Sequence, residues 1–220
     1  MGAKGVTTAA GLAAQPDNVV LRFDYKRTKD GATINSGTEY KLAADWLIDA
    51  SPPSPVDELV DPGGHLPDTE QLDYAVLRLA SPAGKHIVGH QEEPGTDPET
   101  MLAPVREWIE LPAQLPDIEQ DKTVLIMQHP QKQPLKLAIG SDAIAGLNAN
   151  QTRLRYATST EPGSSGSPAF NIQWQLIALH HLGDPNFGHD HDPEWNQGIP
   201  VTAIHGLLAQ RDKLAELAAE

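Results

Sequence analysis

The stretch Thr158–Phe170 (TSTEPGSSGSPAF) contains the residues best suited to chemistry, because it places Ser165 in a short run of serines and glycines. A serine hydroxyl is a weak nucleophile that needs a base, a tight turn to expose it and amide donors for the developing oxyanion. Gly163 and Gly166 give the backbone the freedom for such a turn. The amide N–H groups of Gly163 and Ser165 could converge on one oxygen. Composition by itself favours a flexible Gly/Ser loop, so the order of the residues must decide.

A second candidate is Asp73, near the start of the apolar segment Leu72–Leu79 (LDYAVLRL). A buried carboxylate in such a segment needs a partner, and orienting an imidazole would supply one. The alternative is an aspartate at the surface, where a strand begins. A catalytic role for Asp73 is preferred only together with the serine motif at Ser165.

The order Gly-x-Ser-Gly-Ser-Pro at residues 163–168 resembles the nucleophile motif of chymotrypsin-like serine proteases, and is closest to bacterial glutamyl endopeptidases and their trypsin-like relatives. It does not fit the esterase motif Gly-x-Ser-x-Gly, because position 167 is serine. The resemblance extends to Leu72–Leu79, Trp174–Gly183 (WQLIALHHLG) and Asn196–Ile204 (NQGIPVTAI), and covers roughly residues 18–218. It implies two antiparallel β-barrels with the site between them, and a serine endopeptidase that uses Ser165, Asp73 and an oxyanion hole of Gly163 and Ser165.

The triad histidine is missing from the place where the resemblance predicts it, several tens of residues before the aspartate. His65 alone precedes Asp73, and it lies in a loop rich in proline and glycine. Residues Val6–Gly11 (VTTAAG) resemble the family's histidine motif faintly, with Gly11 in the place of histidine. Three hypotheses remain open: a histidine upstream of Met1, a true loss that makes the chain a pseudoprotease, or a different alignment. We favour the first, because the opening strands of the first barrel are also missing from the pattern.

Four histidines gather near the end of the chain, at positions 180, 181, 189 and 191, with Asp184, Asp190 and Asp192 among them. Such a cluster could bind zinc or nickel, but an acidic solvated loop explains it as well, and we predict neither a metal nor a cofactor. The resemblance to glutamyl endopeptidases implies that His180 and Thr160 bind an acidic side chain before the scissile bond, with His181 and Gly183 beside them. The alternative is that both histidines are packed strand residues. His129, at the end of an apolar segment, is interpreted as structural.

The composition limits the class of partner. The chain has 220 residues, 30 acidic against 16 basic side chains, a net charge of −14 and no cysteine. This charge argues against nucleic acid and anionic membranes, and leaves a peptide or protein substrate, with other domains of a larger protein as possible partners. The first residues lack the pattern of a secretory signal, although a removed signal would leave no trace. The cytoplasm is slightly favoured over export.

Short segments of β-forming residues recur about every ten residues with turns between them, which is typical of an all-β barrel or sandwich. The clearest are residues 18–25, 72–79, 123–128, 135–139, 152–157, 175–179 and 198–201, and 40–48 is a weaker candidate. Five prolines predict an exposed loop over Ser51–Thr69. Apolar periodicity predicts an amphipathic helix over Thr202–Ala218, capped by Thr202. We therefore expect one peptidase domain, with a first barrel over 1–110 that is incomplete at its start, a second barrel over 111–201 and a C-terminal helix over 202–220.

Overall fold

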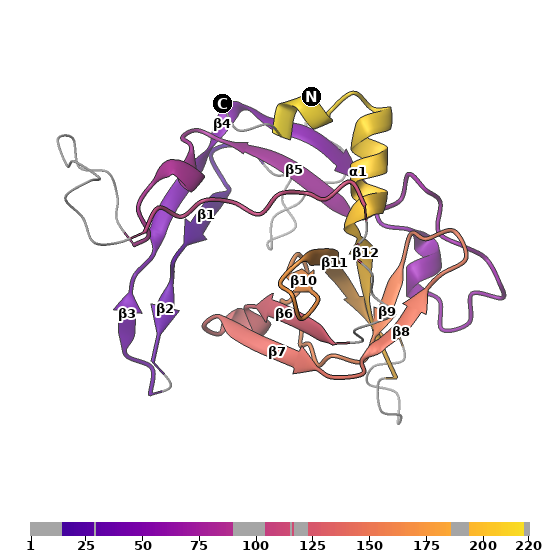
Figure 1. Cartoon of the computed structure of the whole chain (residues 1–220). Coiled ribbons are helices and arrows are strands. Elements are labelled where there is room, and N and C mark those ends of the chain that lie inside the picture. The colour runs from indigo at the N-terminus through magenta and orange to yellow at the C-terminus, as the bar shows by residue number, and fades with distance from the viewer. Residues whose placement is uncertain are drawn as a thin grey trace. The chain divides into compact units, whose positions relative to one another are not determined.

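The computed structural model describes residues 15–28, 30–89, 104–114, 116, 123–185 and 194–217. In this part of the chain the fold is mostly β, with one α-helix near the C-terminus (Figure 1). This confirms the predicted all-β class with a C-terminal helix. The contacts divide the chain into two compact units, the first formed by residues 1–50 and 75–110 and the second by 51–74 and 111–220. No helix in the described ranges is long and apolar enough to span a membrane.

The first unit contains a sheet of three strands in the order β1 (Val20–Phe23), β4 (Thr38–Ser51) and β5 (Tyr74–Leu79). Burial alternates along the start of β4, as expected for a strand with one covered face. Leu42 and Trp46 form the core of this unit. The short strands β2 (Lys26–Arg27) and β3 (Thr33–Asn35) pair separately, and a 3-10 helix, η2, spans Ala83–Lys85.

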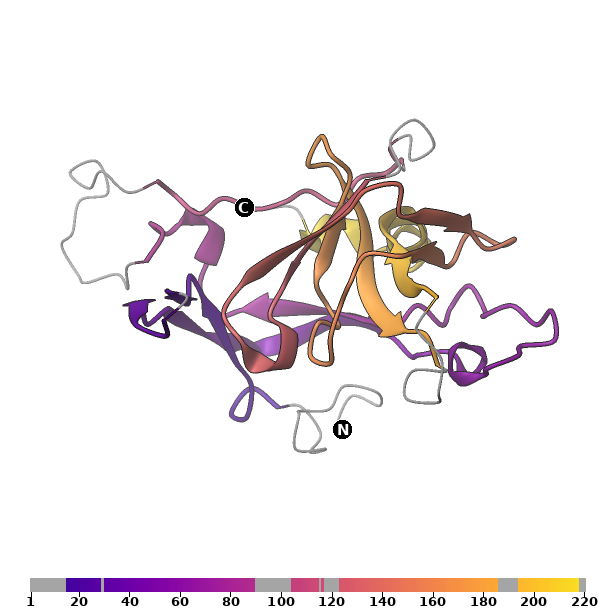
Figure 2. The ribbon, with the colours of Figure 1, turned by 90° about the horizontal axis from the view of Figure 1, so that it is seen from below.

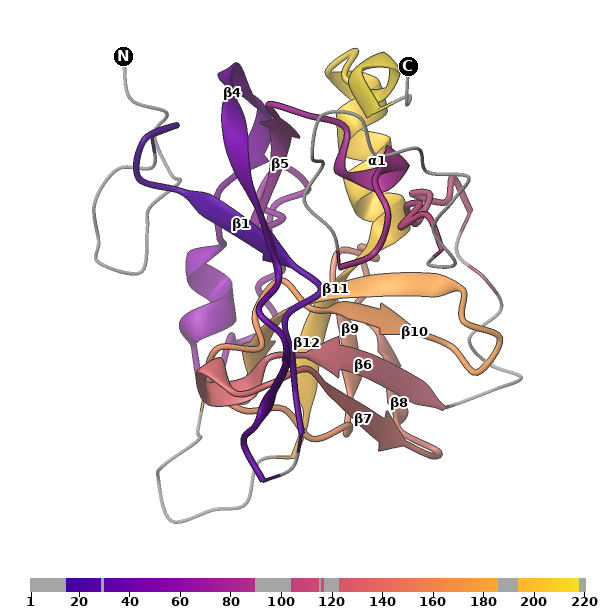
Figure 3. The same ribbon diagram turned by 90° about the vertical axis from the view of Figure 1, so that its left-hand side faces the viewer.

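The second unit is built on a sheet of seven strands, in which every neighbouring pair is antiparallel. Its order is β7 (Lys136–Gly140), β6 (Val124–Gln128), β10 (Pro168–Phe170), β11 (Leu176–Gly183), β12 (Asn196–Pro200), β9 (Leu154–Tyr156) and β8 (Ile144–Leu147). Figure 3 shows β7, β6, β10 and β11 side by side, and the sheet curls on through β12 to form a half-barrel. The core on its inner face includes Val124, Ile126, Leu154, Tyr156 and Ile177.

The pairing of β11 with β12 is irregular at the two adjacent histidines. His180 lies opposite Gly198 and Leu182 lies opposite Gln197, so the register shifts between His180 and Leu182. Such a bulge inserts one extra residue in one strand and redirects the side chains around it. His181 is therefore the extra residue of the bulge, which the sequence pattern did not predict.

The segment from Ser51 to Asp73 leads from β4 to β5 and lies beside β8 and β9 (Figure 1). Its two ends are joined by Ser51, whose Oγ donates to the carbonyl of Glu70 at 2.7 Å and accepts from the amide of Leu72 at 2.6 Å. A 3-10 helix, η1 (Pro55–Glu58), begins after Ser54. The prediction of an exposed loop is confirmed for most of the segment but is wrong at its buried residues, which are Ser51, Ser54, Asp57 and Pro67.

The α-helix is shorter than predicted. α1 spans Val201–Gln210 and packs against β11 and β12 (Figure 2). It follows Pro200, and no side chain caps it, so the predicted cap at Thr202 is wrong. Asp212 adopts a left-handed conformation with φ of 56°, and the amide of Lys213 donates to the carbonyl of Leu208 at 2.8 Å. This Schellman arrangement ends the helix, and a separate 3-10 turn, η5 (Leu214–Leu217), follows where the helix was expected to continue.

The structure shows two compact units, whereas the sequence predicted two barrels with defined boundaries. The contacts place residues 51–74 with the second unit, whereas the sequence analysis assigned all of 1–110 to the first barrel. Both the two-barrel architecture and the boundary near 110 stay predictions. A further 3-10 turn, η4 (Pro130–Lys132), completes the described elements of the second unit.

Candidate active site

Ser165 lies exposed in the loop between β9 and β10, in a turn formed by two glycines. Gly163 has a φ of 95° and Gly166 a φ of 86°, a left-handed region that side chains other than glycine rarely adopt. Within the described residues, the amide N–H groups of Gly163 and Ser165 donate to no backbone carbonyl. Both donors are therefore available to an incoming oxygen.

The loop around Ser165 is anchored on both sides. Ser164 is buried, and its hydroxyl donates to Oε1 of the Gln128 side-chain amide at 2.5 Å. Nε2 of that amide donates to the carbonyl of Ser159 at 3.2 Å. The amide of Gly166 donates to the carbonyl of His180 at 2.8 Å. These bonds tie the loop to β6 and β11, so it is a defined turn and not a loose Gly/Ser linker.

The hydroxyl of Ser165 has a backbone partner. Its Oγ donates to the carbonyl oxygen of His181 at 3.1 Å. Among the described residues, no imidazole forms a hydrogen bond with Ser165 Oγ. His65 is exposed in the segment between β4 and β5. Residues Val6–Gly11, where the family's histidine motif is faintly matched, lie outside the described residues.

Asp73 is placed directly before β5, and its side chain is 41% exposed. The expectation of a buried carboxylate is therefore wrong, because the residue lies at the strand's start with a left-handed φ of 45°. Its partner is an imidazole all the same, since Oδ2 of Asp73 lies 3.2 Å from Nδ1 of His181. The structure thus brings together Ser165, Asp73 and His181. The ring of His181 contacts the carboxylate of Asp73, and the backbone carbonyl of His181 accepts from Ser165.

A buried polar chain continues from His181 into the sheet. Nε2 of Gln197 lies 3.1 Å from Nε2 of His181 and donates to Oδ1 of Asp57 at 2.9 Å. An amide nitrogen is only a donor, so Nε2 of His181 must accept, and the ring proton must lie on Nδ1, where it is donated to Asp73. The hydrogen bonds thereby assign one tautomer to His181.

This series of hydrogen bonds ends in a buried ion pair. Arg153 and Asp57, whose side chains are 2% and 5% exposed, form a bidentate contact with N–O distances of 2.9 and 2.6 Å. Arg153 also donates to the carbonyl of Gln71 at 2.7 Å, two residues before Asp73. The segment that carries Asp73 is therefore fixed to β9 by a fully paired guanidinium.

His180 points to the other face of the sheet. Its Nδ1 lies 2.8 Å from the hydroxyl of Tyr156, and the residue is 3% exposed. Burial lowers the pKa of His180 to about 4, helped by the neighbouring His181. Burial also raises the pKa of the Tyr156 hydroxyl, which stays protonated. The imidazole of His180 is therefore neutral at pH 7 in the absence of an acidic ligand, whereas the predicted role uses an imidazolium.

The other predicted substrate-binding residues meet at Asn196. Oγ1 of Thr160 donates to Oδ1 of Asn196 at 2.8 Å, and Nδ2 of Asn196 donates to the carbonyl of Thr158 at 2.7 Å. Gly183 lies opposite Asn196 across the β11–β12 pair. Thr160 and Gly183 therefore both lie beside Asn196, whereas the partner of His180 is Tyr156.

Sequence reasoning missed five residues that complete this arrangement: Asp57, Arg153, Tyr156, Asn196 and Gln197. The amides at 196 and 197 stand in the stretch NQGIP, which was interpreted only as a strand. The one feature of the sequence that could have pointed to these two amides is their position directly before Gly198. His129 forms a hydrogen bond at a turn, as predicted, with Nδ1 3.0 Å from the carbonyl of Gln133.

The predicted absence of a metal stays a prediction. His189, Asp190, His191 and Asp192 lie outside the described residues. Within the described ranges, no group of three or more histidine, aspartate or glutamate side chains is arranged to hold a metal ion.

Comparison with known proteins gives the family. A family model described as the trypsin-like peptidase domain matches residues 1–179. The chain is also similar to an uncharacterized protein, y4fB, of Sinorhizobium fredii, with 24% identity over 169 residues. That match covers 69% of this chain and 24% of the relative, so the chain spans about a quarter of the length of the curated relative it matches. Since the family model matches most of its length, this chain belongs to the trypsin-like peptidase domain family.

Proposed function

We propose that the chain is the peptidase domain of a serine endopeptidase with two antiparallel barrels, in which Ser165 attacks the peptide carbonyl. The observation that carries this proposal is the exposed Ser165 between two left-handed glycines, with the amides of Gly163 and Ser165 unused by the backbone. Attack forms a bond from Oγ to the carbonyl carbon, and the two amides stabilise the oxyanion. Loss of the amine leaves an acyl-enzyme on Ser165, which water then hydrolyses.

The base that accepts the proton of Ser165 comes from outside the described residues. The ring of His181 is turned to Asp73 and Gln197, and only its carbonyl meets the serine. In the family order, the base precedes the aspartate. Without it, turnover is expected to fall by several orders of magnitude.

Specificity for glutamate or aspartate before the scissile bond is the finer part of the proposal. It rests on the positions of Thr160, His180, His181 and Gly183 in the motif. A substrate carboxylate beside His180 would favour the imidazolium and so raise the low pKa of that ring. Acidic specificity should therefore appear as proton uptake when a glutamyl peptide binds.

A fluorophosphonate probe tests the nucleophile, with the modified residue identified by mass spectrometry. We expect labelling of Ser165 in a protein that includes the catalytic base, and loss of this labelling in Ser165→Ala. Ser141→Ala is the matched control, because Ser141 is also exposed and lies in the turn between β7 and β8. Equal labelling of the Ser165→Ala protein would contradict the assignment.

A second candidate is a pseudoprotease that binds peptides without cleaving them. The bond from Ser165 Oγ to the carbonyl of His181 favours it, because this hydroxyl points to an acceptor that cannot act as a base. The expected result is then no fluorophosphonate labelling, together with saturable binding of a glutamyl peptide that Thr160→Val weakens. Turnover of that peptide would exclude this candidate.

A further inference from the structure

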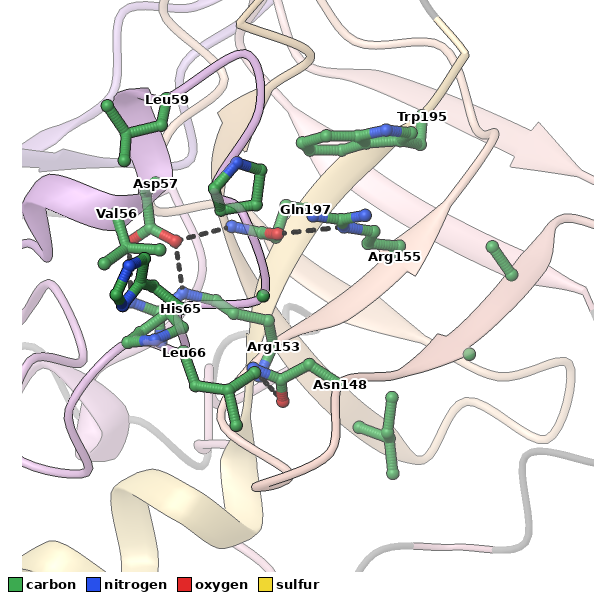
Figure 4. Close-up of a pocket in the computed structure, with 16 residues that line it drawn as sticks. Val56, Asp57, Leu59, His65, Leu66, Asn148, Arg153, Arg155, Trp195 and Gln197 are labelled. Carbon is green, nitrogen blue, oxygen red and sulfur yellow. Dashed lines mark hydrogen bonds and ion pairs between the residues drawn. The ribbon is translucent and has the colours of Figure 1, made fainter.

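A second concave site lies within the second unit, between the 56–67 segment and strands β8, β9 and β12 (Figure 4). Its cavity volume is about 450 Å³, within the range of about 300–1,000 Å³ that is usual for ligand pockets. Leu59, Pro62, Leu66 and Leu147 give it apolar walls, and Trp195 closes one side. None of these residues belongs to the turn that carries Ser165.

Among the charged side chains that line this pocket, Arg155 is a cation without a carboxylate partner in the described part of the chain. Arg153 and Asp57 line it but neutralise each other in their buried pair. Arg155 is exposed, and among the described residues it forms no ion pair with a carboxylate. An unneutralised guanidinium in a concave site is uncommon on a chain with a net charge of −14. It marks the pocket as a place for an anionic group.

The guanidinium of Arg155 is also held in a fixed orientation. Its central carbon lies 4.1 Å from the centroid of the Trp195 ring, and its Nε is 3.3 Å from Oε1 of Gln197. Figure 4 shows the guanidinium between the indole and the amide. Stacking and one hydrogen bond fix the plane of the group but use only Nε, so both Nη atoms remain for a bidentate contact. A planar fork of this kind matches a carboxylate.

We propose that this pocket binds the C-terminal carboxylate of a polypeptide whose last side chain is apolar. Such a residue carries its carboxylate and its apolar group on the same Cα, which suits a cation placed directly beside leucine and proline walls. A glutamate or aspartate side chain presents a carboxylate alone and would leave those walls uncovered. The site shares Asp57, Arg153 and Gln197 with the polar network beyond His181, but none of its lining residues belongs to the turn that carries Ser165.

The test uses three tripeptides on the whole chain: acetyl-Ala-Ala-Leu with a free carboxylate, the same peptide as its C-terminal amide, and acetyl-Ala-Ala-Glu amide. Calorimetry measures affinity, and the indole N–H signal of Trp195 reports the place of binding. That signal is identified by its loss in Trp195→Phe. We expect the free acid to bind and to shift the Trp195 signal, with affinity that falls as salt is added.

The decisive variant is Arg155→Gln, which removes the cation at an exposed position. A charge-assisted contact of this kind implies a loss of roughly tenfold to a hundredfold in affinity. Arg211→Gln is the matched control, because Arg211 lies in the same unit but outside the pocket, and its binding should equal that of the unchanged chain. Leu66→Glu should also abolish binding by placing a like charge beside the ligand.

Four outcomes would overturn the proposal. They are equal binding of the leucine amide, unchanged binding by Arg155→Gln, preference for the glutamyl amide over the free acid, and no binding of the free acid at millimolar concentration. Fluorophosphonate labelling of Ser165 is measured separately, so a failure here leaves the peptidase proposal unaffected.

Discussion

The two faces of β11 place adjacent histidines in opposite surroundings. On the inner face, His180 is enclosed by the core and has the hydroxyl of Tyr156 as its side-chain partner. On the outer face, His181 lies in a bulge and joins Asp73 to Gln197. One side chain type therefore serves two purposes within a single dipeptide. What differs is whether the surroundings supply enough polar partners.

The inner face shows the cost of desolvation. Burial disfavours the charged imidazole, which is why the pKa of His180 is lowered to about 4. On the outer face each polar atom has a counterpart: Asp73 accepts from His181, His181 accepts from Gln197, and Asp57 accepts from Gln197 and Arg153. A complete network of this kind holds its members in one geometry. The outer face should therefore be the more sensitive to removal of any single partner.

Removing Arg153 should give the largest effect, because it breaks the buried end of the outer network. Arg153→Met keeps most of the side chain's volume but leaves Asp57 buried without its cation, which typically costs about 3–5 kcal/mol. Urea unfolding followed by circular dichroism measures the loss. Arg211→Met, at a partly exposed pair with a 3.6 Å separation, should lose at most about 1 kcal/mol. A double variant, Arg153→Met with Asp57→Leu, should recover much of the loss, and equal losses in the two single variants would refute the comparison.

Acid should weaken the inner face through His180. The pKa of this imidazole is about 4 in the folded chain and 6.5 for the unperturbed side chain. Between these values the unfolded chain binds a proton that the folded chain does not. The contribution is therefore fully present above pH 6.5 and is lost as the pH falls to about 4, at about 1.4 kcal/mol per pH unit and on the order of 3 kcal/mol in all.

Other groups titrate in the same range, so the measurement is a difference between two proteins. The free energy of unfolding is followed from pH 7.5 to 4 in the unchanged chain and in His180→Gln, which cannot take up the proton. The variant should show the flatter profile over this range. Parallel profiles would mean that His180 is protonated as readily in the folded chain as in the unfolded one.

Replacing Gln197 should give an intermediate loss. Gln197→Leu removes the donors to His181 and Asp57 and leaves Nε2 of His181 buried without its partner, which costs about 1–3 kcal/mol. Asp73 still accepts from Nδ1–H, so the ¹⁵N shifts of His181 should keep the Nδ1–H tautomer, while the Nε2 shift changes with the loss of its donor. Gln210→Leu, at an exposed position near the end of α1, should change stability by no more than about 0.5 kcal/mol. A shift of the ring proton to Nε2 in Gln197→Leu would show that Gln197, and not Asp73, sets the tautomer.

The inner face was largely predictable from the sequence, and the outer face was not. Short runs of β-forming residues predicted β6, β9 and β11, and two glycines allowed a tight turn at Ser165, because strand propensity and φ preferences act locally. The ion pair of Arg153 and Asp57 joins positions 96 residues apart. Neither partner lies in an apolar pattern, and the prolines around Asp57 indicated an exposed loop. Only the folded chain shows that they meet.

Two other differences have local causes that residue types did not reveal. The bulge at His181 inserts one residue without glycine or proline to mark it, so the position of its side chain could not be predicted. The end of α1 depends on Asp212 adopting a left-handed conformation, which aspartate tolerates but does not require. Asp73 does have an imidazole partner, but this is His181 of β11, and the role of Asp73 as the acid of a triad stays a prediction.

Asp73→Asn should change stability the least, and it separates a structural role from a catalytic one. Asparagine tolerates the left-handed φ of 45°, and its carbonyl oxygen still accepts from Nδ1 of His181. The side chain is 41% exposed, so the loss of its charge should cost under about 1 kcal/mol in urea unfolding. If Asp73 is the triad acid, the same variant should nevertheless lower fluorophosphonate labelling of Ser165 by orders of magnitude, because the base would lose its orienting charge. A loss of several kcal/mol in stability would instead place Asp73 with Arg153 among the groups that hold the outer face together.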